Sequence, residues 1–483
     1  MQHRGTGARR ARTAWCAGVA ALALLAGACG SNSSDDGSGS GAEPPETTEA
    51  AAEQATGTFG DLEEPICGEG DVTVDPAQAG LGTDALYIGV ANDRTAQVAP
   101  GLFKVNYDAS VAFAEWCNAQ GGIGGLPIEI VDLDAKVFDV EAAMTTACSS
   151  VFAMVGGGFA QDQLEFSGKE SSDFHQCGMI DLPGFVVSAE KGDSNGQVQA
   201  VPNPGTTVAN TWLRDYHELY PETTRSTTVW GELPSLEVVK NKYEAAVADV
   251  DGMEDIGDQT YPAVGATDWT PYVQKLIESG ANSITWVGDV SFLKSFMTMA
   301  RQQQWEGTVI SETNVYDEQL LAGGDAIEGT VARVTVHPLE EADEWPAVEQ
   351  YLSMVEEHVP DGVVGPMGMQ SLSAWLLFAT SANACAAAND GVLDRECILE
   401  QAADAEGWTG GGLHAPQDPA PAADVVASPC GLLMVVEDGR FVRLYPELGG
   451  EGDDGDGFHC PEDGVSEVPA NAGQGAVDPD RPT

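Results

Sequence analysis

Polar side chains, aromatic rings and glycines follow several apolar stretches of this chain, and together they could bind a small polar molecule. Amides and acids offer hydrogen bonds and charge, rings offer stacking, and glycines allow close approach of the backbone. The same residue types occur in ordinary turns, but here they recur at the end of one apolar stretch after another. The candidate ligand-binding residues are Asn92, Arg94, Gly158, Phe159, Gln161, Phe185, Trp230, Glu232, Asp289 and Tyr316.

The sequence contains no motif that indicates catalysis, a nucleotide or a metal. The stretch "VGGGF" at 155–159 lacks the Lys and Ser/Thr of a phosphate-binding loop and the spacing of a dinucleotide fingerprint. HExxH and CxxC are missing from the sequence. We therefore expect a binding protein and not an enzyme, with no cofactor and no metal site.

The elements that must position these residues alternate between strand and helix. "ALYIGVAN" (85–92) has the pattern of a buried strand, and "DASVAFAEWCNAQGG" (108–122) that of a helix ended by glycines. The alternation restarts after the Pro-bounded "VPNPGTT" (201–207). The order predicts an α/β fold of two lobes, each a mostly parallel sheet flanked by helices. Ligands bind at the carboxyl ends of such strands, which is where the candidate residues lie.

Near the C-terminal end, "GLLMVVEDGRFVRLYP" (431–446) has the pattern of a hairpin with Asp438 and Gly439 at its tip.

The order of motifs from 113 to 157, "FAEWCNAQGGIGGLPIEIVDLDAKVFDVEAAMTTACSSVFAMVGG", resembles the branched-chain-amino-acid (Leu/Ile/Val-binding) type of ABC-transporter solute-binding protein. Further similarity lies in "DWTPYVQKLIESGANSITWVGD" and in the later "WTGGGLH". The resemblance implies a class I periplasmic-binding (Venus-flytrap) fold with three hinge crossovers. It also implies a monomer that closes on a solute and presents it to a membrane permease.

The resemblance also implies the lobe boundaries: 84–205 with 337–405 for the first lobe, and 206–336 with 406–447 for the second. In the family, an amino-acid carboxylate is held by hydroxyl groups after the third and fourth strands. The matching positions, 157–161 and 182–185, carry no hydroxyl group. These missing hydroxyl groups count against specificity for amino acids alone, so we expect a small polar organic solute, either an amino acid or an amide-like molecule. The alternative is an extracellular ligand-sensing domain that uses the same fold in signalling.

The N-terminal segment has the features of an export signal. Several arginines precede an apolar run, and "LLAGAC" places Cys29 after small residues, as in an actinobacterial-like lipoprotein signal. We expect a signal peptide at 1–28, acylation of Cys29, and a disordered acidic Ser/Gly/Pro tether at 29–65. This places the protein at the extracytoplasmic face of the cell membrane, held through its lipid anchor only.

The charge of the chain excludes polyanionic partners. With 21 Lys and Arg against 76 Asp and Glu, the formal net charge is −55, so we expect no binding to nucleic acid. The segment 448–483 is acidic and rich in Gly and Pro, and is expected to be largely disordered.

Eight of the ten cysteines lie beyond Cys29, an even number that favours disulfides in an exported protein. Only the pair Cys385 and Cys397 is close enough in sequence for us to predict its bond.

Overall fold

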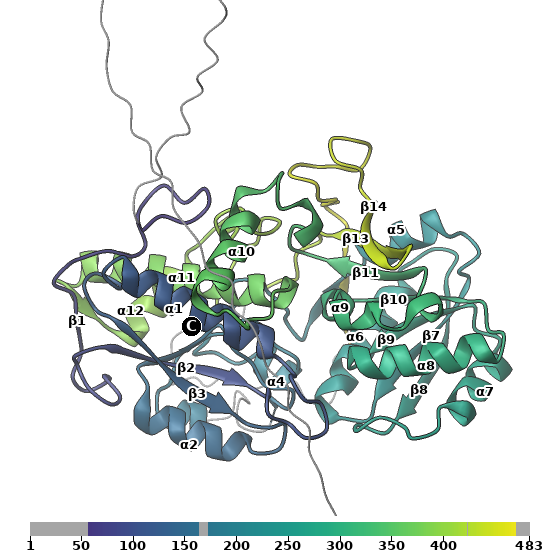
Figure 1. Ribbon diagram of the computed structural model, residues 1–483, viewed down its shortest axis with the longest axis horizontal. Helices are drawn as coiled ribbons and strands as arrows, with labels where there is room; N and C mark the ends of the chain where they lie inside the picture. Colours follow the sequence, from purple (N-terminus) through teal and green to yellow (C-terminus); the bar gives the residue numbers. More distant parts are fainter. Residues whose placement is uncertain (1–56, 164–171, 423, 470–483) are drawn as a thin grey trace, which may run out of the picture. The chain divides into compact units, whose positions relative to one another are not determined.

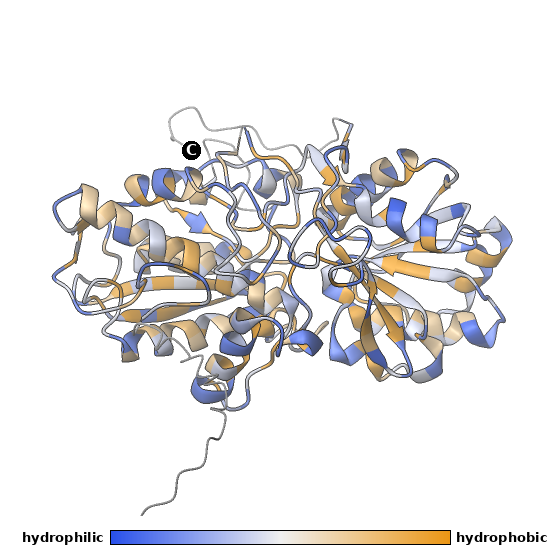
Figure 2. Cartoon of the chain, turned by 90° about the horizontal axis from the view of Figure 1, so that it is seen from above, coloured by the Kyte–Doolittle hydropathy of each residue, from blue (hydrophilic) through white to orange (hydrophobic). Residues whose placement is uncertain are grey.

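The computed structural model describes residues 57–163, 172–422 and 424–469 (Figure 1). Cys29 and the expected signal peptide lie outside these residues. Two mostly parallel sheets dominate the described chain, and each is covered by helices. Figure 2 shows hydrophobic residues concentrated in the strands between the helices. The predicted α/β class is confirmed.

The first sheet has the strand order β3-β2-β4-β5, and all of its pairings are parallel. Helices α1 and α11 lie on one side of β2 and β3, and α2 lies on the other (Figure 1). Its strands are β2 (Leu86–Asn92), β3 (Ile128–Asp134), β4 (Ala153–Val155) and β5 (Asp181–Leu182). The helices near it are α1 (Lys104–Ala119), α2 (Val140–Ser150), α3 (Asp173–Gln176), α4 (Ala189–Gly192), α10 (Pro346–His358), α11 (Pro366–Ala388) and α12 (Arg395–Ala403).

The second sheet has the order β14-β13-β11-β10-β9-β7-β8. Its five strands from β7 to β11 pair in parallel, and β13 and β14 form the predicted antiparallel hairpin. Its strands are β7 (Arg225–Gly231), β8 (Glu254–Tyr261), β9 (Ser283–Val287), β10 (Thr308–Ser311), β11 (Thr330–Val334), β13 (Leu432–Glu437) and β14 (Arg440–Tyr445). Its helices are α5 (Thr211–Leu219), α6 (Pro234–Ala248), α7 (Thr270–Ser279), α8 (Val290–Gln302) and α9 (Glu318–Leu321).

Side chains of β9 show how the second sheet is buried on both faces. Ile284 and Trp286 join one hydrophobic cluster with Phe296 of α8, whereas Val287 joins another with Tyr243 of α6. This is the period-two alternation of a strand, with apolar residues on both faces as in a covered parallel sheet.

The chain passes three times between the two sheets, through 183–206, 335–345 and 404–431. Helices α10, α11 and α12 follow the second passage; α10 and α11 pack against α1 of the first sheet, and α12 packs against α11. The hairpin β13–β14 follows the third passage and completes the second sheet. Shorter elements are β1 (Thr73–Val74) with β12 (Val392–Leu393), β6 (Thr207–Ala209) with β15 (Val465–Glu467), and the 3-10 helices η1 (Thr313–Val315), η2 (Gly324–Ala326) and η3 (Leu339–Glu341).

Helix α11 is the one helix among the described residues that is long and apolar enough to cross a membrane by length and composition. Within its apolar window, 72% of the residues are buried inside the protein, and its Trp375 and Phe378 are fully buried. The length and hydropathy of α11 therefore fit its place in a protein core.

All eight cysteines of the described residues form disulfides. The predicted bond between Cys385 and Cys397 is confirmed, and it joins α11 to α12. The other three bonds join Cys67 with Cys117, Cys148 with Cys177, and Cys430 with Cys460.

The described parts of two segments, 57–65 and 448–469, are ordered where disorder is expected. Phe59, within the expected tether, is buried in the core, and the neighbouring Gly60 N–H donates to the side chain of Gln350 at 2.9 Å. In the acidic C-terminal segment, β15 pairs with β6, and Nδ1 of His459 contacts the Asp215 carboxylate at 3.0 Å. The composition of these residues is polar, but the buried Phe59, the pairing of β15 with β6 and the bond between Cys430 and Cys460 join them to the rest of the protein.

Candidate functional site

A cavity of about 600 Å³ lies where the strands of both main sheets end. Its walls include Val137 beyond β3, Phe185 beyond β5, Tyr261 at the end of β8 and Asp289 beyond β9. The carboxyl ends of parallel strands are the usual ligand-binding edge of such sheets, and the volume suits a small organic molecule. This cavity is therefore the candidate site.

Most of the cavity wall is apolar. Three of the apolar side chains that line it stay exposed even though they are large: Phe138 at 58%, Val264 at 55% and Val363 at 44%. The apolar lining residues are Val98, Leu102, Phe103, Val105, Val137, Phe138, Phe185, Val186, Val187, Leu233, Leu236, Val239, Val264, Phe292, Val363 and Met367, among others. Phe103 and Phe185 contact one another with ring centroids 4.2 Å apart. An apolar surface of this extent suits a ligand with a hydrophobic body.

A buried lysine, Lys242 of α6, contributes to the polar part of the wall together with Asn203. Its Nζ donates to Oδ1 of Asn203 at 2.6 Å and to the carbonyl oxygen of Asn203 at 3.4 Å. Burial lowers the pKa of Lys242 to about 8, because the ammonium loses its hydration. Beside it, the Arg333 guanidinium pairs with the Glu312 carboxylate at 3.1 Å.

Two aspartates on the wall begin helices. Oδ1 of Asp289 accepts a hydrogen bond from the Ser291 N–H at 2.8 Å at the start of α8, and Oδ1 of Asp317 accepts from the Gln319 N–H at 2.7 Å at the start of α9. Burial raises the pKa of Asp317, and the nearby charge of Asp289 adds to this effect. Both carboxylates thus serve as N-caps, which satisfies orphan donors of the helix ends.

Asp93 does not line the cavity but holds two residues of its wall in place. Its carboxylate accepts hydrogen bonds from the N–H of Val137 at 2.5 Å and of Ala160 at 2.7 Å, both of which line the cavity. The turn that it holds is tight, since Val137 adopts a φ of 73°. Burial raises the pKa of Asp93 to about 6, while the two N–H groups oppose that rise.

Of the ten residues proposed from the sequence, Phe185 and Asp289 line this cavity. Tyr316 lines a neighbouring cavity of about 360 Å³, where its hydroxyl donates to the Glu340 carboxylate and its ring meets Phe441 edge to face. The remaining seven candidates take other positions.

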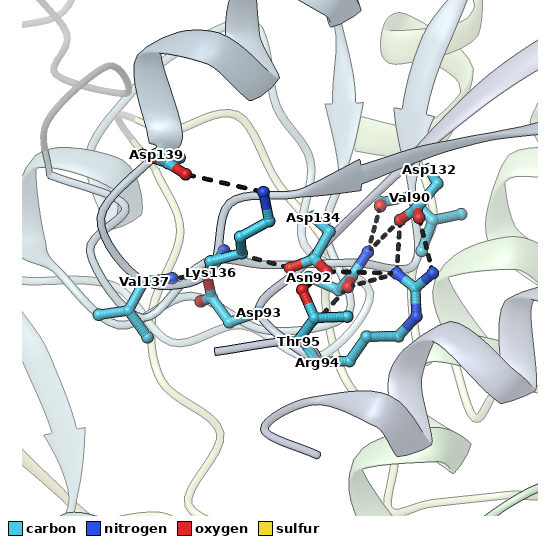
Figure 3. A network of polar contacts seen from close by, with 10 residues as sticks. All are labelled: Val90, Asn92, Asp93, Arg94, Thr95, Asp132, Asp134, Lys136, Val137 and Asp139. Carbon is cyan, nitrogen blue, oxygen red and sulfur yellow. Dashed lines mark hydrogen bonds and ion pairs between the residues drawn. The ribbon is translucent and has the colours of Figure 1, made fainter. Parts of the chain in front are cut away.

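Asn92 and Arg94 belong to a network of polar contacts beside β2 and β3 (Figure 3). Both terminal nitrogens of the Arg94 guanidinium donate to the Asp132 carboxylate at 2.6 Å, and its face lies 4.0 Å from the centre of the Tyr107 ring. The Asn92 amide also donates to Asp132, at 2.9 Å. The charge of Arg94 is therefore compensated within the first sheet, and neither residue lines the cavity.

The residues that follow β4 support the cavity wall from outside. Phe159 is buried in a cluster with Val140 and Met144 of α2. A Cβ atom on Gly158 would lie 2.6 Å from the Phe185 ring, so glycine allows that ring its place. Gln161 donates its amide to the carbonyl oxygen of Val137 at 2.8 Å.

Trp230 and Glu232 also lie off the lining of the cavity. The Trp230 indole donates to the Asp258 carboxylate at 2.7 Å, and Lys240 lies over its ring at 5.9 Å. Glu232 is exposed, and its backbone N–H donates to the carbonyl oxygen of Tyr261 at 2.9 Å.

Sequence reasoning missed Lys242, Asn203 and the apolar residues that form most of the wall. Lys242 had a visible signal, because it lies four residues from Val238 and from Ala246, on the buried face of α6. No group of His, Cys, Asp and Glu among residues 57–163, 172–422 and 424–469 is arranged to hold a metal ion.

Comparison with known proteins agrees with this architecture. Residues 232–440 match the family described as "Periplasmic binding protein". No curated protein sequence matches the chain.

Solved structures share the fold. A leucine-binding protein from Thermotoga maritima aligns with a TM-score of 0.61 and 14% identity, covering 75% of this chain and 98% of the other. A fatty acid ABC transporter substrate-binding protein from Thermomonospora curvata has a TM-score of 0.62 and 16% identity, covering 78% and 95%. A branched-chain amino acid transporter substrate-binding protein from Streptococcus pneumoniae, in complex with isoleucine, has a TM-score of 0.57 and 15% identity, covering 74% and 100%.

These matches confirm the predicted class I periplasmic-binding fold and the resemblance to this group of binding proteins. The matched family and the similar structures are described as binding proteins.

Proposed function

We propose that this protein is the solute-binding component of an ABC importer and captures a small organic solute with polar groups, of the amino-acid or amide-like class. The observation that carries the proposal is the cavity of about 600 Å³, which is lined by residues beyond the strands of both main sheets. Such a site lets a solute bind both halves at once and so stabilise their closed arrangement.

Two lobes would make this closure, consisting of 84–205 with 337–405 and of 206–336 with 406–447. The passages at 183–206, 335–345 and 404–431 would serve as the three hinge crossovers. The protein would act as a monomer, and a membrane permease would bind its closed arrangement. The apolar run and small residues before Cys29 support a lipid anchor on that cysteine, which would hold the protein at the extracytoplasmic face of the cell membrane.

Binding is tested by titrating the purified mature protein with amino acids, amides and organic acids, and measuring heat and melting temperature. We expect at least one of these solutes to bind and to raise the melting temperature. Failure of all three classes would contradict the proposal.

The anchor is tested separately by fractionating cells that express the wild type or Cys29→Ala. We expect the wild type in the membrane fraction and the variant outside it. A wild-type protein whose mature chain begins elsewhere and is recovered outside the membrane would contradict the anchor and leave solute binding intact.

A further inference from the structure

We infer that the solute is an amphipathic organic acid, whose carboxylate pairs with Lys242 and whose hydrocarbon body lies along the apolar wall of the cavity. The inference rests on the proposed solute-binding function and assigns the solute to amphipathic organic acids in place of the amino-acid or amide-like class. Two observations carry it, namely the surroundings of one ammonium group and the composition of the wall.

Lys242 is a buried cation that forms no ion pair with a carboxylate in the described part of the chain. Its residue is 3% exposed, and among the described residues no carboxylate oxygen lies within 4.0 Å of its Nζ. Its hydrogen-bonding partner is the neutral Asn203. A buried ammonium is costly unless it is paired, so an anion arriving in the cavity would gain a strong charge-assisted hydrogen bond.

Lys240 provides a direct contrast on the same helix. Its Nζ pairs with the Glu244 carboxylate at 3.3 Å and lies over Trp230. Lys240 does not line the cavity, whereas Lys242 does.

The acidic groups that act on Lys242 from a distance are Glu312, Asp193 and Asp162, and each has closer partners of its own. The Asp193 carboxylate accepts from the Gly205 N–H at 3.0 Å, and the Asp162 carboxylate accepts from the N–H groups of Val187 at 2.8 Å and Ser188 at 3.0 Å.

The charge of Glu312 is compensated by Arg333, whose Nη1 lies 3.1 Å and 3.3 Å from the two carboxylate oxygens. Asp289 and Asp317 each commit an oxygen to the start of a helix. The arrangement thus offers an anion site and does not require an ammonium group on the solute.

The apolar wall indicates what the rest of the solute is made of. Phe138, Val264 and Val363 line the cavity from three separate loops and remain more than 40% exposed. Large exposed apolar side chains are uncommon in clusters on a soluble protein, and burying them against a hydrocarbon body would remove that surface from water. Each methylene group added to the solute should therefore tighten binding by roughly fourfold until the wall is covered.

The test compares solutes that differ in one feature at a time. Calorimetric titration of the mature wild-type protein uses butanoate, hexanoate and octanoate, then octan-1-ol, and then leucine, phenylalanine and acetamide. We expect octanoate to bind more tightly than butanoate and at least tenfold more tightly than octan-1-ol.

Variants locate the two contacts. Lys242→Met keeps the length of the side chain and removes its charge, so it should fold stably and lose the preference for octanoate over octan-1-ol. Lys240→Met is the matched control and should keep that preference. Val264→Ser should weaken octanoate binding more than Leu81→Ser, because Leu81 is 63% exposed but does not line the cavity.

The outcomes separate the inference from the proposed function. If leucine, phenylalanine or acetamide binds and the alkanoates do not, the solute class is overturned while solute binding stands. If Lys242→Met keeps the full preference for octanoate, the role of Lys242 is wrong. If no compound binds, both the inference and the proposed function fail.

Discussion

The hydroxyl group of Ser235 donates a hydrogen bond of 2.7 Å to the carbonyl oxygen of Ala160. Ser235 is buried in the first turn of α6, which follows strand β7 of the second sheet. Ala160 follows β4 of the first sheet and lines the cavity. One hydrogen bond therefore joins the two halves of the protein beside the candidate site.

Replacing Ser235 with alanine should weaken solute binding by roughly threefold to tenfold, because the loss of one such hydrogen bond makes the arrangement around the cavity less favourable. Titration with whichever solute binds the wild type measures the effect. The control is Ser149→Ala on the exposed face of α2. An affinity equal to that of the wild type would show that this contact does not contribute to the binding arrangement.

His414 should make stability depend on pH. Its Nε2 lies 2.7 Å from Oγ of Ser373 and its Nδ1 lies 2.8 Å from the carbonyl oxygen of Ala415. Burial lowers its pKa from 6.5 to about 4, so the fold favours the neutral ring. The contribution of the neutral His414 ring to the free energy of unfolding is fully present above pH 6.5 and is lost as the pH falls towards 4.

The size of this effect should be about 3 kcal/mol in the free energy of unfolding between those limits. Denaturant unfolding from pH 7 to pH 4 measures it as the difference between the wild type and His414→Gln, since the variant lacks this titration. His358→Gln at the end of α10 is the control. Parallel pH profiles for the wild type and His414→Gln would contradict the prediction.

Gly410→Ala should destabilise the protein beyond the cost of its backbone conformation. Gly410 has a φ of 64°, and an added Cβ atom would lie 2.8 Å from Nε2 of His414 and 2.9 Å from Oγ of Ser373. We expect a loss of about 2 kcal/mol or more in the free energy of unfolding.

Gly407→Ala is the matched control, because Gly407 has a φ of 59° with no atom near an added Cβ. Denaturant unfolding of both variants separates the backbone cost, which they share, from the steric contact. Equal losses would mean that the neighbours of Gly410 move aside freely.

The disulfide between Cys430 and Cys460 should hold the C-terminal segment on the second sheet. It closes a sequence separation of 30 residues, compared with 12 for Cys385 and Cys397. Replacing both Cys430 and Cys460 with serine should lower the free energy of unfolding by roughly 3 kcal/mol and expose residues 448–469 to proteases.

The same double replacement at Cys385 and Cys397 should lower the free energy of unfolding by less, because that bond closes a shorter loop, and it should leave residues 448–469 protected. Limited proteolysis with mass spectrometry identifies the cut sites. Cleavage of 448–469 at the wild-type rate in the Cys430 and Cys460 variant would show that β15 and its neighbours hold the segment without the bond.

The sequence by itself determined the order of strands and helices, the hairpin at Asp438 and Gly439, and the bond between Cys385 and Cys397. Each depends on residues close together in the chain, whose apolar periodicity, turn chemistry or separation is visible without a fold. The alternation of elements also predicted that ligands would meet the ends of the strands, and Phe185 and Asp289 do line the cavity there.

Only the tertiary structure decided which polar groups face that cavity. Arg94 is paired with Asp132 because β2 and β3 lie side by side in a register that places Val90 beside Asp132. Lys242 reaches the cavity because α6 packs its buried face against β7, β8 and β9, where Asn203 arrives from the first passage between the sheets. Such pairings depend on contacts between residues far apart in sequence. Local sequence patterns therefore predicted that a ligand would bind at the ends of the strands, but not which side chains would line the site.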